Sequence, residues 1–183
     1  WLFAAFVVGF PSGMNILHGD RPADSGLRVD NLAGSAKEVG PAVAMMAAGV
    51  AVTGWLAGGW HWVSWGTFFD KLGVYVFWGP FQQYLMQAFA LRRLMQAGLA
   101  GPVAAGIAPV LFGLCHAPNW PLVALTVGAG LVWCRLFLRK PNLITLGAAH
   151  AALAILVYHA LPMDWLQSLA VGGEYLNRLG LSL

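Results

Sequence analysis

Long apolar stretches separated by short polar segments form the dominant pattern of this chain. The apolar stretches cover residues 1–10, 39–58, 72–91, 101–116, 121–138 and 143–161. A helix needs roughly 20 apolar residues to cross a bilayer, and the five later stretches reach or approach that length. The pattern predicts an all-α fold, a polytopic transmembrane helical bundle of about six spans, the first of them partial. Because Trp1 opens an apolar run with no charged flank, we expect it to be the visible end of a longer chain.

The polar segments are expected to lie at the membrane surfaces. Residues 11–38, which begin at Pro11-Ser12-Gly13, carry seven of the seventeen charged residues, and an interfacial helix is expected to start within 32–38. Residues 59–70 are rich in tryptophan, which is typical of an aromatic belt at the headgroups. A weak amphipathic pattern in residues 162–183 predicts an interfacial C-terminal tail. No linker divides the chain, so residues 1–183 are expected to form a single membrane domain.

The composition excludes a soluble globular domain. Hydrophobic residues make up 59% of the chain and charged residues 9%, whereas soluble domains are roughly 25% charged. The chain has no array of basic and aromatic residues, so no nucleic-acid partner is expected. Cys115 and Cys134 lie inside apolar spans without metal or redox spacing, and we interpret both as small core residues.

The charges in the loops predict an orientation. If the spans alternate, one face of the membrane receives eight of the ten basic residues: Arg21, Arg28, Lys37, Arg92, Arg93, Arg135, Arg139 and Lys140. The opposite face receives only Lys71 and Arg178. Cytoplasmic loops are rich in lysine and arginine. The loops holding Arg92-Arg93 and Arg139-Lys140 are therefore expected in the cytoplasm, with the protein in a bacterial inner membrane.

Amides and imidazoles recur inside three of the apolar stretches. Gln82, Gln83 and Gln87 occupy the stretch that contains Gly79-Pro80, where we expect a kink, while His116 and His150 lie in later stretches. Hydrocarbon offers no hydrogen-bond partner, so such side chains must face inward. Residues four apart share a helix face, which groups Gln83 with Gln87. The sequence predicts one polar cavity, open to the non-cytoplasmic side or closed, without a carboxylate.

These residues resemble a motif of the CPBP intramembrane proteases, which include CAAX-processing endopeptidases and bacteriocin self-immunity proteins. That family has Glu-Glu-x-x-x-Arg, then Phe-x-x-x-His, then His-x-x-x-Asn on successive helices. The corresponding positions here are Gln82, Gln83, Gln87, Phe112, His116, His150 and Ala154. The motif-bearing core extends from about residue 24 to 161.

The resemblance implies a degenerate active site. In the family the first glutamate activates water with the first histidine, and the later His and Asn stabilise the oxyanion or help to bind a metal. Here Gln82 and Gln83 replace the glutamates, Gln87 the arginine and Ala154 the asparagine. An amide cannot accept a proton near neutral pH, and a general base contributes roughly 10²–10⁴ in rate. We therefore expect a pseudoprotease that acts as a membrane binding or assembly subunit, in contact with the bilayer and with a membrane-protein partner or transmembrane peptide.

Other interpretations stay open at this point. The protein could be an active endopeptidase with a variant mechanism based on histidine or on a metal. It could instead hold a pigment or haem within a membrane complex, or the glutamines could simply join helices. No metal site is predicted, and no cofactor is assigned. His116 and His150 are the only weak candidates for metal ligands, because zinc usually takes three protein ligands and His159 is expected to point elsewhere. His61 is interpreted as a headgroup-level residue.

Overall fold

The computed structural model describes residues 2–181, with side chains from residue 7 onward, and Trp1 lies outside the described part. The chain forms α1 (Leu2–Leu17), α2 (Leu32–Leu56), α3 (Trp65–Gln83), the π-helix η1 (Tyr84–Leu91), α4 (Arg92–Gln96), α5 (Gly101–Leu114), α6 (Trp120–Arg139), α7 (Leu143–Ala160), α8 (Met163–Leu166), the 3₁₀ turn η2 (Gln167–Leu169) and α9 (Gly172–Arg178). Within residues 2–181 there is no strand. The predicted all-α class is confirmed.

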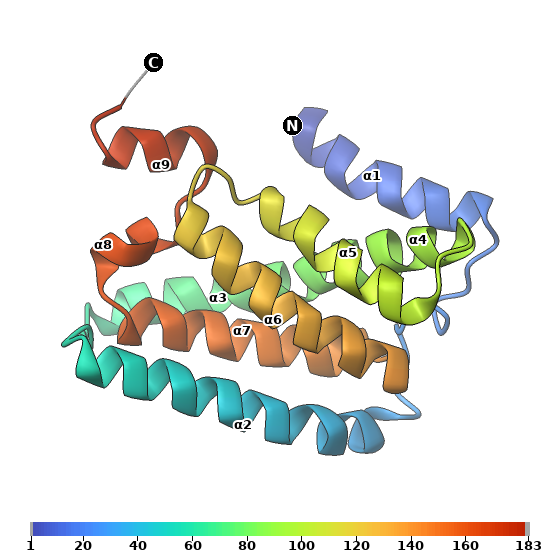
Figure 1. Ribbon diagram of the computed structural model, residues 1–183, viewed down its shortest axis with the longest axis horizontal. Coiled ribbons are helices and arrows are strands. Elements are labelled where there is room, and N and C mark those ends of the chain that lie inside the picture. Colours follow the sequence, from blue (N-terminus) through green and yellow to red (C-terminus); the bar gives the residue numbers. More distant parts are fainter. Residues whose placement is uncertain (1, 182–183) are drawn as a thin grey trace.

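Three of these helices, α2, α6 and α7, are long and apolar enough to cross a membrane. α5 is also apolar but is shorter than these three helices. α3, η1 and α4 follow one another without a break. Figure 1 shows the long helices side by side, with α7 in the middle of the lower layer. α7 packs against both α2 and α3, while α5 packs against α6 and η1. The protein is a helical membrane bundle.

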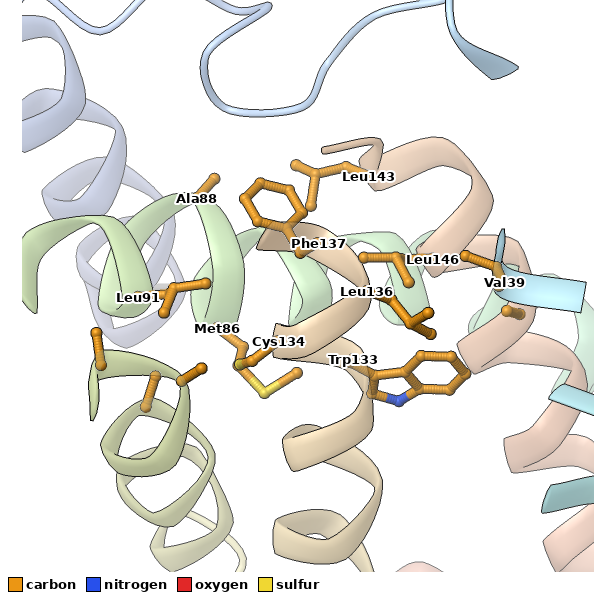
Figure 2. Packing of buried hydrophobic residues seen from close by; sticks show 14 residues of the cluster. Val39, Met86, Ala88, Leu91, Trp133, Cys134, Leu136, Phe137, Leu143 and Leu146 are labelled. Carbon is orange, nitrogen blue, oxygen red and sulfur yellow. The ribbon is translucent and has the colours of Figure 1, made fainter. Parts of the chain in front are cut away.

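The apolar core lies where η1, α5, α6 and the first turns of α7 meet (Figure 2). Its largest fully buried apolar side chains are Met86, Leu91, Leu143 and Leu146. Association of helices within lipid depends on close van der Waals packing because lipid tails are themselves apolar. Close packing of these side chains therefore holds η1 in place.

The seam between α3 and α7 shows how close this packing is. A Cβ atom at Gly147 would lie 2.6 Å from Pro80 Cγ, and one at Gly79 would lie 3.0 Å from the Gly147 carbonyl oxygen. Real Cβ atoms essentially never come as close as the first of these distances. Two glycines thus allow the backbones of α3 and α7 to touch, which sets the register of the polar residues on both helices.

Several predicted boundaries were wrong. The first helix does not end at Pro11 but continues to Leu17, because Asn15 Nδ2 donates to the Tyr84 hydroxyl at 3.0 Å, which in turn lies 3.3 Å from Ser12 Oγ. These contacts hold α1 against η1. Residues 32–38 form the first turns of α2, with Ser35 fully buried, and not a separate interfacial helix.

The kink expected at Gly79-Pro80 takes a different form. Pro80 stays inside α3, and the helix widens into η1 from Tyr84 onward. Proline has no N–H to donate within the helix, and π-helical turns are rare features that appear mostly inside α-helices, frequently at functional sites. The change in winding falls between Gln83 and Gln87, and therefore bears directly on the polar cluster.

Candidate functional site in the bundle interior

The helix that carries the glutamines begins with a cap and ends with an ionic anchor. Ser64 Oγ accepts a hydrogen bond from the Thr67 backbone N–H at 3.1 Å, which caps the start of α3. At the other end Arg92 and Arg93 both pair with Asp20 in the segment between α1 and α2. With both ends fixed, Gln83 and Gln87 lie in the buried middle, and each is fully inaccessible to solvent.

Gln83, Gln87 and His150 form one chain of hydrogen bonds. Gln87 Nε2 donates to Gln83 Oε1 at 3.3 Å, and Gln83 Nε2 lies 3.0 Å from His150 Nδ1 on α7. An amide NH₂ only donates, so His150 Nδ1 accepts and Nε2 carries the proton. Residues 67 positions apart in the sequence are thereby joined into a neutral network.

The network is incomplete at Gln87. Gln87 Oε1 is buried and has no hydrogen-bond partner among the residues that the structure describes. If the O and N atoms of both glutamine amides were exchanged, each hydrogen bond in the chain would run in the opposite direction. The unpaired Gln87 atom would then be Nε2 instead of Oε1. Buried polar groups are nearly always paired, so an unpaired one calls for an explanation such as a missing water or ligand.

His116 lies in the turn that follows α5 and contacts Phe112. Its Nδ1 is 3.2 Å from the Phe112 carbonyl oxygen, and its ring packs edge-on against Phe112 at 5.2 Å between centroids. Because a carbonyl only accepts, Nδ1 carries the proton and Nε2 is the acceptor nitrogen. His116 itself is about nine-tenths buried.

The structure does not bring every predicted position into the network. Gln82 is half-buried, and its side chain makes no hydrogen bond among residues 7–181. Ala154, one turn after His150 on α7, is half-buried and contributes only a methyl group. The geometry thus links Gln83, Gln87 and His150, and leaves Gln82 and His116 outside the chain of hydrogen bonds.

No group of three or more His, Cys, Asp or Glu side chains able to hold a metal occurs in the described part of the chain. His159 does not extend the His116–His150 pair, because its ring stacks on Trp62 at 5.4 Å with 21° between the planes. Two imidazoles fall short of the three protein ligands of the usual catalytic zinc site.

Sequence reasoning missed Asn119, which shapes the turn after His116. Its fully buried amide Nδ2 donates to the carbonyl oxygens of Leu166 and Ala170 at 2.8 and 3.0 Å, while Oδ1 accepts from the Leu122 N–H at 3.2 Å. Asn119 therefore caps α6 and ties the C-terminal segment to the bundle. An asparagine just before an apolar run is a recognised helix-start signal.

Comparison with known families gives one finding. The family model described as type II CAAX prenyl endopeptidase Rce1-like matches residues 64–156, half of the chain. That range contains Gln82, Gln83, Gln87, Phe112, His116, His150 and Ala154. No curated protein and no solved structure gives a significant match. The chain therefore belongs to the CPBP family of Rce1-like, CAAX-endopeptidase-type membrane proteins.

Proposed function

We propose that this protein is a non-hydrolytic pseudoprotease that binds a transmembrane peptide or a membrane-protein partner. One observation carries the proposal: a neutral hydrogen-bonded network joins the fully buried Gln83 and Gln87 to the half-buried His150. The family motif has two glutamates and an arginine at positions 82, 83 and 87. In this chain all three are glutamine.

The chemistry of the network supports binding over hydrolysis. Peptide hydrolysis in this family requires a carboxylate that takes a proton from water, and an amide cannot do so near neutral pH. Charge is also absent from the Gln83–Gln87–His150 chain, so no buried ion has to be stabilised there. An amide network that is self-paired except at one atom is suited to receiving one polar group, such as a peptide bond. The unpartnered Gln87 amide atom is the proposed point of contact.

A cleavage assay tests the loss of hydrolysis. Wild type, His116→Ala and the variant Gln82→Glu/Gln83→Glu/Gln87→Arg/Ala154→Asn are reconstituted in lipid with a prenylated CAAX peptide. We expect wild type to cleave no faster than His116→Ala. Cleavage by wild type that is lost in His116→Ala would restore the active-endopeptidase alternative. Gain of cleavage in the fourfold variant would show that the fold still supports hydrolysis once the family's side chains are present at these four positions.

Binding is measured separately with the same peptide. Fluorescence anisotropy of the labelled peptide in nanodiscs is expected to report saturable binding to wild type and weaker binding to Gln87→Leu. The matched control is Gln96→Leu, a polar residue at the charged end of the same continuous helix. Equal affinity for all three proteins would remove the network from the proposed binding site.

We further propose that the charged end of the bundle faces the cytoplasm of a bacterial inner membrane. Support comes from contacts that bring two loops and the start of α4 together: Asn31 Nδ2 donates to the Pro141 carbonyl at 3.0 Å, and Arg92 Nη1 donates to the Asp24 carbonyl at 2.8 Å. In a Cys115→Ser/Cys134→Ser background, Ala97→Cys should resist an impermeant thiol reagent in intact cells, while Val63→Cys should react. The reverse pattern would invert the orientation.

A further inference from the structure

Three successive residues in the C-terminal segment have a left-handed backbone conformation. Gln167, Ser168 and Leu169 have φ angles of 46°, 52° and 63°. The Ala170 N–H closes this left-handed turn by donating to the Gln167 carbonyl oxygen at 3.0 Å. Residues other than glycine enter the left-handed region as single positions, because their Cβ atom crowds a carbonyl oxygen. A run of three is therefore strained, and it persists only because the surrounding structure imposes it.

Asn119 holds both ends of the left-handed turn. Its amide nitrogen donates to the carbonyl oxygens of Leu166 and Ala170, the residues immediately before and after the turn, at 2.8 and 3.0 Å. The Asn119 side chain is itself fixed, because it is fully buried and its Oδ1 accepts from the Leu122 N–H at 3.2 Å. The bonds of one buried amide thus keep the strained turn in place.

Further contacts fasten the same segment to the turn that carries His116. The Gly172 N–H donates to the carbonyl oxygen of Ala117, the residue after His116, at 3.3 Å. Figure 1 shows α8 beside the first turns of α6, and the two helices are in contact. The apolar cluster at this contact consists of Leu122, Val157, Leu161 and Leu166, with Leu169 packed against it. Residues 162–172, called the strap below, therefore lie against the turn that contains His116.

We propose that the strap has two positions: the closed position that the structure shows, and an open one that exposes His116 to solvent. The Asn119 bonds, the bond from Gly172 to Ala117 and the apolar cluster stabilise the closed position, while the strained turn opposes it. Segments of low local stability open before the rest of a fold, and such two-state elements control access to sites. His116 is about nine-tenths buried when the strap is closed. The proposal holds whether the protein binds its peptide or cleaves it.

Hydrogen exchange of the full chain in nanodiscs measures how often the strap opens. Ser168→Gly relieves the strain at one position, whereas Ser168→Ala keeps it. The Ser168 side chain makes no hydrogen bond in the described part of the chain, so neither variant removes one. We expect the amides of residues 162–172 to exchange about threefold more slowly in Ser168→Gly than in Ser168→Ala. Equal exchange in the two variants would show that the turn is not strained and would overturn the proposal.

The exposure of position 116 is measured by the reaction of a thiol placed there. In a Cys115→Ser/Cys134→Ser background, labelling of His116→Cys by a water-soluble thiol reagent is followed over time. We expect Asn119→Ala, which removes both bonds to the turn, to speed labelling about tenfold. Because Asn119 also caps α6, the Ser168 variants decide: labelling should be slower in Ser168→Gly than in Ser168→Ala. Labelling that does not follow the exchange rates of the strap would refute its control of His116.

Val63→Cys in the same background is the matched control. Val63 is exposed and lies outside the strap, in the loop between α2 and α3. It should react at the same rate in every strap variant, and a slower reaction in Ser168→Gly would assign the effect to the whole bundle and overturn the proposal. Thermal unfolding confirms that each variant is folded; if Asn119→Ala is not, the two Ser168 variants give the result alone.

Discussion

Two polar regions act on the same long helix, one in its middle and one at its end, and they use different chemistry. In the middle Gln83 pairs with His150 and Gln87 without any formal charge. At the C-terminal end of the helix, Arg92 and Arg93 both form ion pairs with Asp20, whose side chain is 3% exposed. Charges are expensive at membrane depth but acceptable near the headgroups, where long basic side chains reach water. The comparison shows that the position along the bundle decides whether a buried contact is ionic or neutral.

The largest expected loss of stability comes from removing the ion pairs of Asp20 with Arg92 and Arg93. Asp20→Ala leaves two guanidinium groups without their shared partner, and removing one member of a buried pair is destabilising by about 3–5 kcal/mol. Because Arg92 and Arg93 keep 24% and 15% exposure, we expect the lower part of that range, about 3 kcal/mol. Thermal unfolding in detergent measures it. The control is Asp30→Ala, whose ion pair with Arg28 is exposed and should matter little; equal effects for both variants would contradict the comparison.

Breaking the neutral region is expected to have a smaller effect that differs between its members. Gln83→Leu leaves His150 Nδ1 and the Gln87 amide unpaired, so we expect a loss of about 1–3 kcal/mol. Gln87→Leu removes one unpartnered buried atom but leaves Gln83 Oε1 without its donor, so the two effects largely offset and the loss should be smaller than in Gln83→Leu. Denaturant unfolding of the two variants side by side gives the difference. A greater loss for Gln87→Leu than for Gln83→Leu would mean that a partner already satisfies Gln87.

Asn119 sharpens the comparison because it is a third buried polar contact, at the end opposite the arginines. Asn119→Ala removes a helix cap and two bonds to the C-terminal segment, a loss of about 1–2 kcal/mol. Limited proteolysis should then cut within residues 162–181 faster than in wild type, while Asn177→Ala, an exposed change in α9, should not alter the rate. Unchanged proteolysis in Asn119→Ala would show that the segment is held by its apolar contacts alone.

The smallest effect is the pH dependence of the exposed ion pair. The hydrogen bond from Arg28 lowers the pKa of the Asp30 carboxyl below its ordinary value. A lowered folded-state pKa contributes stability above the unfolded pKa, and that contribution is lost as pH falls through the folded pKa. Wild type should therefore lose slightly more thermal stability than Asp30→Asn as the pH falls from 7 to below the ordinary carboxyl pKa. A larger loss in Asp30→Asn would reverse the assigned sign.

Much of the fold could be predicted because apolar runs are bounded by clear signals. Asn142 Oδ1 accepts from the Thr145 N–H at 2.9 Å and begins α7 at the residue where the sixth stretch was expected. The first helix was predicted too short, because proline reads as a boundary unless tertiary contacts such as Asn15 with Tyr84 are known. Local sequence does not encode those contacts.

For the candidate site, spacing alone paired Gln83 with Gln87, and the structure adds their link to His150. What spacing could not provide was the π-helical winding of η1, which depends on packing around Met86 and Leu91. Gln82 is a second position that spacing could not place: it is adjacent to Gln83 in the sequence, yet its side chain takes no part in the hydrogen-bond network. The link of Asn119 to the left-handed turn depends on a contact with a residue 47 positions later in the chain.

The contact of Gly79 and Gly147 with the facing helix also limits the routes by which another molecule can reach the centre of the bundle. A seam in which a single methyl group would collide with Pro80 leaves no gap for a side chain, still less for a helix, to slide through from the lipid. Lateral passage into the interior therefore cannot run between α3 and α7 unless that backbone contact separates. A molecule from the bilayer would therefore have to approach Gln83 and Gln87 along a different pair of helices, because the α3–α7 seam closes this side of the bundle.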